Sequence, residues 1–427
     1  MEDRIIYHID VNSAFLSWQA CSILKLHPDA TDIRTIPAVI GGNEETRHGI
    51  VLAKSPLAKK AGIQTGEPLM SARKKCPGLT VVSPDYREYV KYSAAFMDLL
   101  KRYAPVVEQY SIDEAFCDMT GTVRLYGDPV VFARKLKDII RKELNFTVNI
   151  GVSTNKLLAK MASDFEKPDK VHTLFPEEIP EKMWPLPVKE LFFVGRASAG
   201  KLASLGIRTI GELANTDVEL LKNNFKKHGE IMWNYANGHD LEIVTDHQAE
   251  NKSYGNSITI PYDVTDMDTA RIILLSLCET VGARIRASKA YISVVSVTIV
   301  GNDFSRISRQ RALDSTTCST EKIYETACKL LEEAWNKTPI RLLGVSTGKA
   351  TRDSYEQISL FDSEKSEKLK KLDSAIDKIR TNYGEDSVMR ASFLSSEHTH
   401  MTQGINRAKR TSASNSALHR QSDPHNL

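Results

Sequence analysis

The chain has 427 residues, 41% of them hydrophobic, so it can fold into several compact units with ample core. Its 57 lysines and arginines nearly balance 54 aspartates and glutamates, so the net charge of +3 does not by itself indicate a nucleic-acid-binding protein. Six cysteines lie apart without a CxxC pair, and the longest apolar stretch (291–300) is too short to cross a bilayer, which argues against a disulfide framework, a zinc site and a membrane protein.

Hydrophobic periodicity predicts a mixed α and β region at the N-terminal end of the chain. Residues 4–9 are a strand that ends at Asp10, and no cleavable signal is expected before it. A helix is expected at 14–24, and a basic, turn-rich region should follow to about residue 78. Residues 89–103 and 130–144 are typical of helices, and 106–119 and 146–153 of extended segments.

The rest of the chain is predicted to hold a helical region and a second mixed unit. Residues 175–245 contain only short helical patterns, broken at glycines. Strands are expected at 257–262, 290–300 and 340–347, with helices at 269–287 and 319–335. A charged helix (365–383) carries Leu369, Leu372, Ile376 and Ile379 at helical spacing, which predicts packing on another element. The tail after it is expected to be disordered.

Three carboxylates are candidates for metal binding. Asp10 closes an apolar strand, and Asp113 and Glu114 interrupt a hydrophobic stretch. Neighbouring residues of a regular strand face opposite sides, so this pair can share metal ions only at a turn or distortion. Two Mg²⁺ ions would offset the unfavourable burial of such acids and support phosphoryl chemistry. The alternative is a solvated hairpin turn with Asp10 as an N-cap-like residue, and the residues by themselves favour that interpretation.

A lysine-rich segment, 151–168, provides a second candidate site. Ser153 or Thr154 can cap a helix that begins at Asn155, with Lys156 and Lys160 on one face and Lys167 just beyond the helix. Ammonium groups in this arrangement suit a polyanion such as a nucleoside triphosphate. The alternative is a basic helix face that simply meets solvent.

Two motifs, SIDE at 111–114 and GVSTNKLLAKMASDFEKPD at 151–169, resemble those of the Y-family, or lesion-bypass, DNA polymerases. The resemblance extends over about residues 4–398. It implies a template-directed DNA polymerase that adds deoxynucleotides to a primer 3′ end with two Mg²⁺ ions. It also implies low fidelity and a role in translesion synthesis and DNA repair.

The resemblance assigns metal ligation to Asp10, Val11, Asp113 and Glu114, and nucleotide binding to Ala14, Phe15, Lys59 and Lys167. Phe15 would be a steric gate, because its ring would clash with a ribose 2′-hydroxyl.

The chain also departs from the family pattern. Asn12 replaces the second acid of the family's first motif, and Lys170 replaces the usual glycine after the lysine–proline motif. In the nucleotide pocket, Ala53 and Pro56 replace a hydroxyl residue and a tyrosine. Lys59 replaces an arginine, which keeps the charge but loses the bidentate fork. We therefore expect this chain to hold the triphosphate by different contacts from those of the family pattern.

The implied architecture is an α+β multidomain right hand. A ferredoxin-like palm would comprise 1–12 and 79–174, small fingers 13–78, a helix-hairpin-helix thumb 175–245 and an α+β little finger 250–350. A clamp-binding peptide and a C-terminal helix would occupy 351–398, followed by the tail, 399–427.

The expected partners are primer–template DNA, a deoxynucleoside triphosphate and a sliding clamp, for a cytoplasmic monomer without membrane contact. DNA contacts are predicted for Lys156, Lys160, Gly195, Gly206, Arg306, Arg309 and Arg311. Gln357, Leu360 and Phe361 would anchor the clamp peptide.

Each of these contacts has a simpler alternative. A plain αα-hairpin explains the glycines, solvated edge charges explain the arginines, and a small packing turn explains the peptide. Two other functions are compatible with parts of the pattern: a non-catalytic DNA- and clamp-binding protein, and an enzyme similar to a nucleotidyl cyclase.

Overall fold

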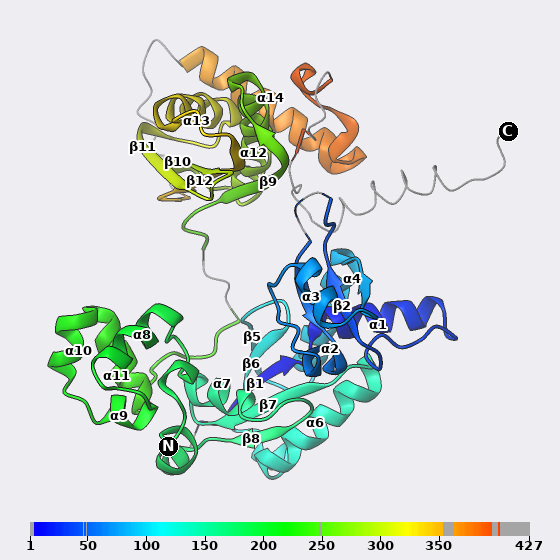
Figure 1. Cartoon of the computed structure of the whole chain (residues 1–427), viewed down its shortest axis with the longest axis vertical. Coiled ribbons are helices and arrows are strands. Elements are labelled where there is room, and N and C mark those ends of the chain that lie inside the picture. The colour runs from blue at the N-terminus through cyan, green and yellow to red at the C-terminus, as the bar shows by residue number, and fades with distance from the viewer. Residues whose placement is uncertain are drawn as a thin grey trace.

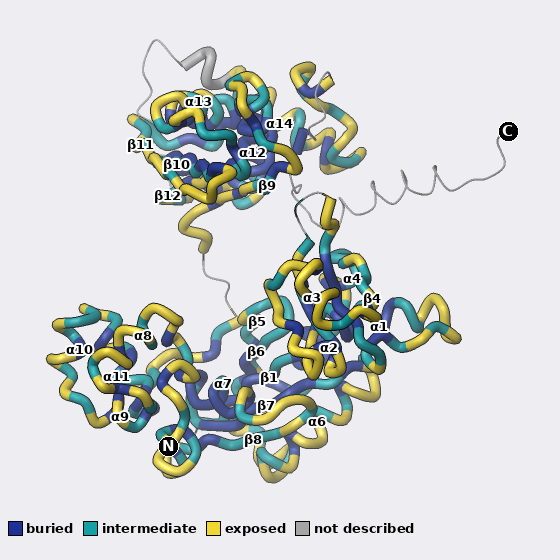
Figure 2. Tube along the Cα trace, in the orientation of Figure 1, coloured by how far each residue is buried: buried dark blue, intermediate teal, exposed yellow. Residues whose placement is uncertain are grey.

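The computed structural model describes residues 4–45, 47, 49–246, 250–352, 363–394 and 400–401. These residues form three β-sheets and a helical region, as Figure 1 shows. Buried residues follow the strands and the helix faces packed on them, whereas the connecting loops are largely exposed (Figure 2). Within the described residues, no helix has both the length and the apolar character needed to span a membrane.

The first unit is a five-stranded sheet, called here the palm sheet, with strand order β5-β6-β1-β7-β8. Strand β1 lies at its centre and pairs antiparallel with both β6 and β7. Its strands are β1 (Ile6–Val11), β5 (Val106–Gln109), β6 (Glu114–Asp118), β7 (Val148–Ser153) and β8 (Val171–Thr173). Its helices are α4 (Tyr86–Lys101), α5 (Val123–Tyr126), α6 (Pro129–Leu144) and α7 (Lys156–Asp164).

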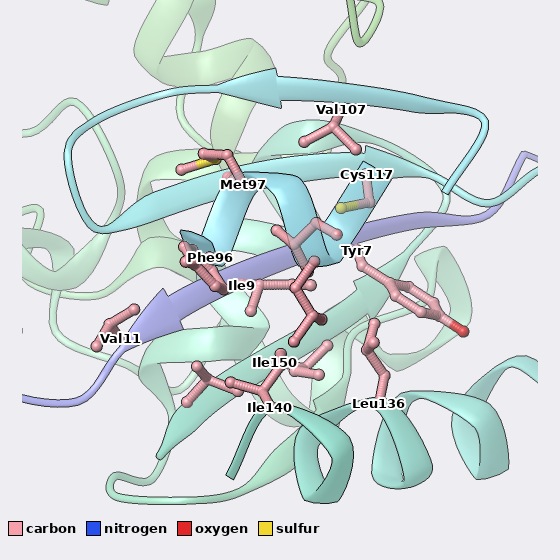
Figure 3. Packing of buried hydrophobic residues seen from close by; sticks show 14 of the residues in the cluster. Tyr7, Ile9, Val11, Phe96, Met97, Val107, Cys117, Leu136, Ile140 and Ile150 are labelled. Carbon is pink, nitrogen blue, oxygen red and sulfur yellow. The ribbon is translucent and has the colours of Figure 1, made fainter. Parts of the chain in front are cut away.

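Alternation along β1 determines which side chains enter the core and which reach the site. Tyr7, Ile9 and Val11 are buried among residues of α4 and α6, and Figure 3 shows this packing. His8 and Asp10 therefore face the opposite side, where α7 packs on the sheet. A Cβ on Gly151 would lie 1.9 Å from the carbonyl oxygen of Ala159, so glycine permits the close approach of α7 to β7.

The region between β1 and α4 contains a small three-stranded sheet, called the fingers sheet, with strand order β3-β2-β4. It comprises β2 (Ala38–Gly41), β3 (Val51–Lys54) and β4 (Thr80–Val82), with α1 (Ala14–Leu26), α2 (Pro56–Lys60) and α3 (Leu69–Lys75) nearby. The sequence pattern predicted only turns between residue 25 and residue 78. Strands of three or four residues are too short to show a clear alternation, so that prediction missed them.

Residues 176–236 are helical, as expected. They comprise one-turn helices η1 (Pro176–Glu178), η2 (Ile179–Met183) and η3 (Val188–Glu190), followed by α8 (Arg196–Ser204), α9 (Ile210–Ala214), α10 (Val218–Phe225) and α11 (Lys227–Ala236). Leu202, Ile210, Leu221 and Met232 are fully buried in one cluster that also includes Leu158 of α7. This helical region therefore packs on the helix that borders the palm sheet.

The third sheet, called the little-finger sheet, has strand order β11-β10-β12-β9. It comprises β9 (Gly255–Val264), β10 (Ile292–Gly301), β11 (Arg306–Thr317) and β12 (Ile340–Gly348), with helices α12 (Met267–Ala287) and α13 (Thr320–Ala334). Both helices share a buried core with alternate residues of the strands, so they cover one face of the sheet (Figure 1). The opposite face carries polar side chains and meets solvent.

Helix α14 (Ser363–Tyr383), followed by the short turns η4 (Glu385–Ser387) and η5 (Ala391–Phe393), docks beside α12. The expected packing was through its apolar positions, but Leu372 and Ile379 are 49% and 40% exposed. The docked face is instead charged, because Asp373 and Arg380 are buried and reach α12. The prediction of docking therefore agrees with the structure. Of the predicted apolar positions, Leu369 and Ile376 are partly buried, whereas Leu372 and Ile379 are exposed.

Candidate active site

Two paired strands place the predicted carboxylates together. Asp10 on β1 lies directly opposite Glu114 on β6, and the backbone N–H of Val11 donates to the carbonyl oxygen of Asp113 at 3.0 Å. Asp113 lies in a bend just before β6. This bend is the distortion that neighbouring acids need in order to approach one site.

Ser111 holds the bend in place. Its Oγ accepts hydrogen bonds from the backbone N–H groups of Asp113 (3.2 Å) and Glu114 (3.0 Å), and donates to Oδ1 of Asp113 (2.7 Å). The serine of the SIDE motif therefore fixes both the backbone turn and one carboxylate. The sequence interpretation included this residue in the motif but gave it no separate role.

Lysines neutralise two of the three carboxylates. The Nζ of Lys167 lies 2.5 Å from Oδ2 of Asp10, and the Nζ of Lys160 lies 2.6 Å from Oε1 of Glu114. Asp113 has no ion-pair partner in the described part of the chain. Among the described residues, Asp113 is therefore the one of the three carboxylates without a neighbouring ammonium group.

Burial dominates the electrostatics of Asp10, whose side chain is only 13% exposed. Burial raises the pKa of Asp10 to about 6, the ammonium of Lys167 opposes this rise, and the carboxylates of Glu114 and Asp113 add to it. A cation close to Asp10 would favour its charged form and relieve the repulsion among the three acids.

The three acids provide only carboxylate oxygens, a donor set that suits a hard divalent cation such as Mg²⁺. Among the described residues, no three acidic, histidine or cysteine side chains already surround one point as metal ligands do. Lys167 and Lys160 are each within ion-pair distance of an oxygen of Asp10 or Glu114. A divalent cation would thus compete with two lysines for these carboxylates.

A cleft of about 580 Å³ opens beside Asp10 and Asp113. The predicted nucleotide-binding residues, Ala14, Phe15, Lys59 and Lys167, all line it, and so does Val11, which was predicted to bind metal. It is also lined by Lys54 and Thr65, which the sequence interpretation did not single out. The sequence did contain a signal for Lys54. It precedes Ser55, the N-cap of the short helix that carries Lys59, so the two lysines lie close together along the chain.

Phe15 lies at the start of α1 within a cluster of aromatic rings. Its ring stacks on Tyr89 of α4, with centroids 4.8 Å apart, and lies 6.1 Å from the rings of both Trp18 and Tyr86. These contacts restrict the ring to one orientation at the edge of the cleft. The geometry is that of a rigid aromatic wall.

The predicted row of ammonium groups along α7 is paired with carboxylates. Lys156 has a side chain that is 8% exposed and contacts Glu108 at 2.8 Å and Glu242 at 3.1 Å. Lys160 is held by Glu114. The helix is capped by Asn155, whose side chain accepts from the N–H of Leu158, rather than by Ser153 or Thr154.

The other predicted DNA-contact residues are spread over two units. Gly195 precedes α8 and Gly206 follows it with a φ of +84°, so the two glycines lie at opposite ends of one helix. Arg306 pairs with Val300 on the open face of the little-finger sheet, where it lines a hollow of about 560 Å³.

Arg309 and Arg311 face the other way, because they pair with the buried residues Val297 and Val295. Arg311 is held by Glu333 of α13 at 2.6 Å. The three arginines therefore do not form one patch. Gln357, Leu360 and Phe361 lie outside the described residues.

Comparisons with known proteins agree on one family. Residues 9–164 match the impB/mucB/samB family, residues 176–207 the HHH motif of that family, and residues 251–360 its C-terminal domain. The chain is 48% identical to a DNA polymerase IV of Clostridium acetobutylicum over 394 residues, which is 92% of this chain and 99% of that protein. It is 36% identical to a DNA polymerase IV of Acetivibrio thermocellus over 409 residues, 95% of this chain and 99% of that protein.

Among solved structures, a Y-family DNA polymerase chimera matches with a TM-score of 0.70 at 23% identity. The match covers 82% of this chain and 100% of the chimera, and it shows that the two share their fold.

Proposed function

The chain belongs to the impB/mucB/samB family of Y-family DNA polymerases, and from this premise we propose that Asp10, Asp113 and Glu114 are the carboxylates at which it extends a primer. It is a template-directed DNA polymerase that uses divalent metal ions and acts in translesion synthesis. The observation that supports this site most strongly is the pairing of Asp10 with Glu114, with Asp113 at the mouth of the adjoining cleft. The same cleft is lined by Phe15 and by lysines.

In the reaction, the primer 3′-hydroxyl oxygen forms a bond to the α-phosphorus of the nucleotide, and the bond from that phosphorus to the bridging oxygen breaks to release pyrophosphate. Two Mg²⁺ ions would supply activation of the hydroxyl and neutralisation of the leaving phosphates. Asp10, Asp113 and Glu114 would hold them, with the backbone of Val11 alongside.

The remaining residues of the cleft bind and select the nucleotide. Lys167 can exchange Asp10 for a phosphate oxygen, because its ammonium lies beside Asp10 and the residue lines the cleft. Lys59 adds a second cation and Ala14 part of the wall. Phe15 lies where it can exclude a 2′-hydroxyl.

The proposed macromolecular partners are DNA and a sliding clamp. We propose that Arg306, on the open face of the little-finger sheet, binds a DNA backbone phosphate. We also propose that Gln357, Leu360 and Phe361 bind a sliding clamp, and that the protein acts as a cytoplasmic monomer.

Primer extension by the purified chain tests the function directly. With primer–template DNA, four deoxynucleoside triphosphates and Mg²⁺, the chain is expected to lengthen the primer and to insert a nucleotide opposite an abasic site, and EDTA is expected to stop both reactions. Gel analysis of a labelled primer measures the products. A chain that binds the DNA but extends no primer would contradict the proposal and favour a non-catalytic DNA-binding protein.

Replacement of Phe15 by alanine is expected to reduce discrimination between deoxyribonucleotides and ribonucleotides by about 100-fold, or about 2.7 kcal/mol. The smaller side chain removes the wall that the ring forms beside the sugar. Single-nucleotide insertion with each sugar gives the ratio of the two kcat/KM values.

Leu16→Ala is a matched control, because Leu16 is the next residue of α1 and is 1% exposed. It removes buried volume from the same helix without touching the cleft, so it should leave the ratio unchanged. Equal ratios in the wild type and Phe15→Ala would show that Phe15 is not the gate.

A further inference from the structure

The cleft beside Asp10 has an uneven distribution of charge. Asp10 and Asp113 form its acidic end, with Lys167 beside Asp10, and the rest of its lining includes Lys54 and Lys59. Lys167 is already paired with Asp10 and with Asp164. The charge of the other two lysines therefore determines what the rest of the cleft attracts.

Lys54 and Lys59 have no carboxylate within ion-pair distance in the described part of the chain. The acid that acts on Lys54 most directly is Glu67, but its carboxylate accepts from Lys75 at 2.5 Å and from the N–H of Gln64 at 3.0 Å. Burial lowers the pKa of Lys54, and the charge of Lys59 lowers it further. Two cations that repel each other thus share one cleft, an arrangement that a bound anion would relieve.

The backbone fixes where both lysine side chains begin, and Thr65 orients one of them. Lys54 ends β3, opposite Val39 of the central strand β2, and its Nζ donates to Oγ1 of Thr65 at 3.3 Å. Lys59 lies on α2, which Ser55 caps by accepting from the N–H of Ala58. Ala53, which precedes Lys54, and Pro56, which lies between the two lysines, bring no side-chain donor into the cleft.

We propose that Lys54, oriented by Thr65, binds the phosphates of the incoming deoxynucleoside triphosphate together with Lys59. This role rests on the proposed polymerase function and adds to it a residue that compensates for the missing donors at Ala53 and Pro56. The reacting phosphate would lie at the acidic end, near Asp10, and the distal phosphates near Lys54. A compact ammonium can serve as such a contact because it acts as a point charge and needs no planar fork.

Nucleotide binding by the full-length Lys54→Met variant tests the proposal. Methionine keeps an unbranched stem and removes the charge and its hydrogen bonds. In single-turnover insertion on primer–template DNA with Mg²⁺, the apparent Kd for dATP is expected to rise about tenfold or more. The maximal rate should change little. Calorimetric titration of dATP into a complex with a dideoxy-terminated primer should show the same loss without turnover.

Further variants separate charge from structure. Lys54→Arg should restore most of the affinity, and inhibition of the wild type by inorganic tripolyphosphate should weaken in Lys54→Met. Lys60→Met is the matched control, since Lys60 lies on α2, is exposed and does not line the cleft. An unchanged Kd in Lys54→Met, or an equal rise in Lys60→Met, would overturn the role of Lys54 but not the proposed function. A wild type that inserts no nucleotide would instead overturn the proposed function.

Discussion

Asp113→Ala is expected to lower primer extension by about three orders of magnitude or more, a loss of at least about 4 kcal/mol of transition-state stabilisation. Asp113 carries the uncompensated negative charge of the site, because Lys167 and Lys160 neutralise Asp10 and Glu114. Without Asp113 the site loses the one of its three carboxylates that no lysine neutralises, so it attracts a divalent cation more weakly. Single-turnover insertion at a series of Mg²⁺ concentrations would measure both the loss of rate and the weaker dependence on metal.

Asp138→Ala provides a matched control, since Asp138 is an acid of the same sheet unit that lies on the surface of α6 with 66% of its side chain exposed. This variant should extend primers as the wild type does. Binding of primer–template DNA, measured without nucleotide, shows whether Asp113→Ala has kept its fold. An Asp113→Ala chain that binds DNA normally and still extends it at the wild-type rate would exclude Asp113 from the metal site.

Glu279→Met is expected to weaken the docking of α14 by about 3–5 kcal/mol. Glu279 of α12 is 3% exposed and contacts Arg380 at 2.6 Å and Arg390 at 2.5 Å. Hydrogen bonds from both arginines lower the pKa of Glu279 against the opposing effect of burial. Loss of the carboxylate would leave the guanidinium of Arg380, 2% exposed, without a counter-charge. Amide hydrogen exchange of the full-length chain, followed by mass spectrometry, would report the opening of α14.

Two further variants test whether the unpaired charge of Arg380 causes the loss of stability. Glu332→Ala removes an exposed ion pair in the same unit, in which Arg271 and Glu332 are 41% and 46% exposed, and should cost less than about 1 kcal/mol. The double variant Glu279→Met/Arg380→Met removes both buried charges and should be less destabilised than Glu279→Met. If the double variant opens more readily than the single one, an unpaired charge is not the cause.

The local features of the site were readable from the sequence because each depends on a few consecutive residues. The SIDE motif contains both the serine that shapes the bend and the acids that follow it. Phe15 lies five residues after Asp10, so a strand end and a helix start place the two beside one cleft. Helices such as α6 and α12 have enough turns to show a clear periodicity, whereas β2, β3 and β4 are too short to do so.

Contacts between distant segments followed no such pattern. The three lysines of 156–167 look alike along the chain, but each meets a different carboxylate: Lys156 meets Glu108, Lys160 meets Glu114 and Lys167 meets Asp10. The position of Arg309 depends on its register with Val297, which places it on the helix-covered side of the sheet. A change of one position in register would have turned it to the open side.

The sequence by itself determined the family and most of the helices and strands, and it predicted the acids and lysines of the site, because motifs and periodicity are properties of short stretches of chain. Only the tertiary structure decided which charges remain without partners. Asp113 and Lys54 are notable because the lysines and acids that could have neutralised them are bound elsewhere. That outcome depends on how segments far apart in the chain pack together, and no local pattern records it.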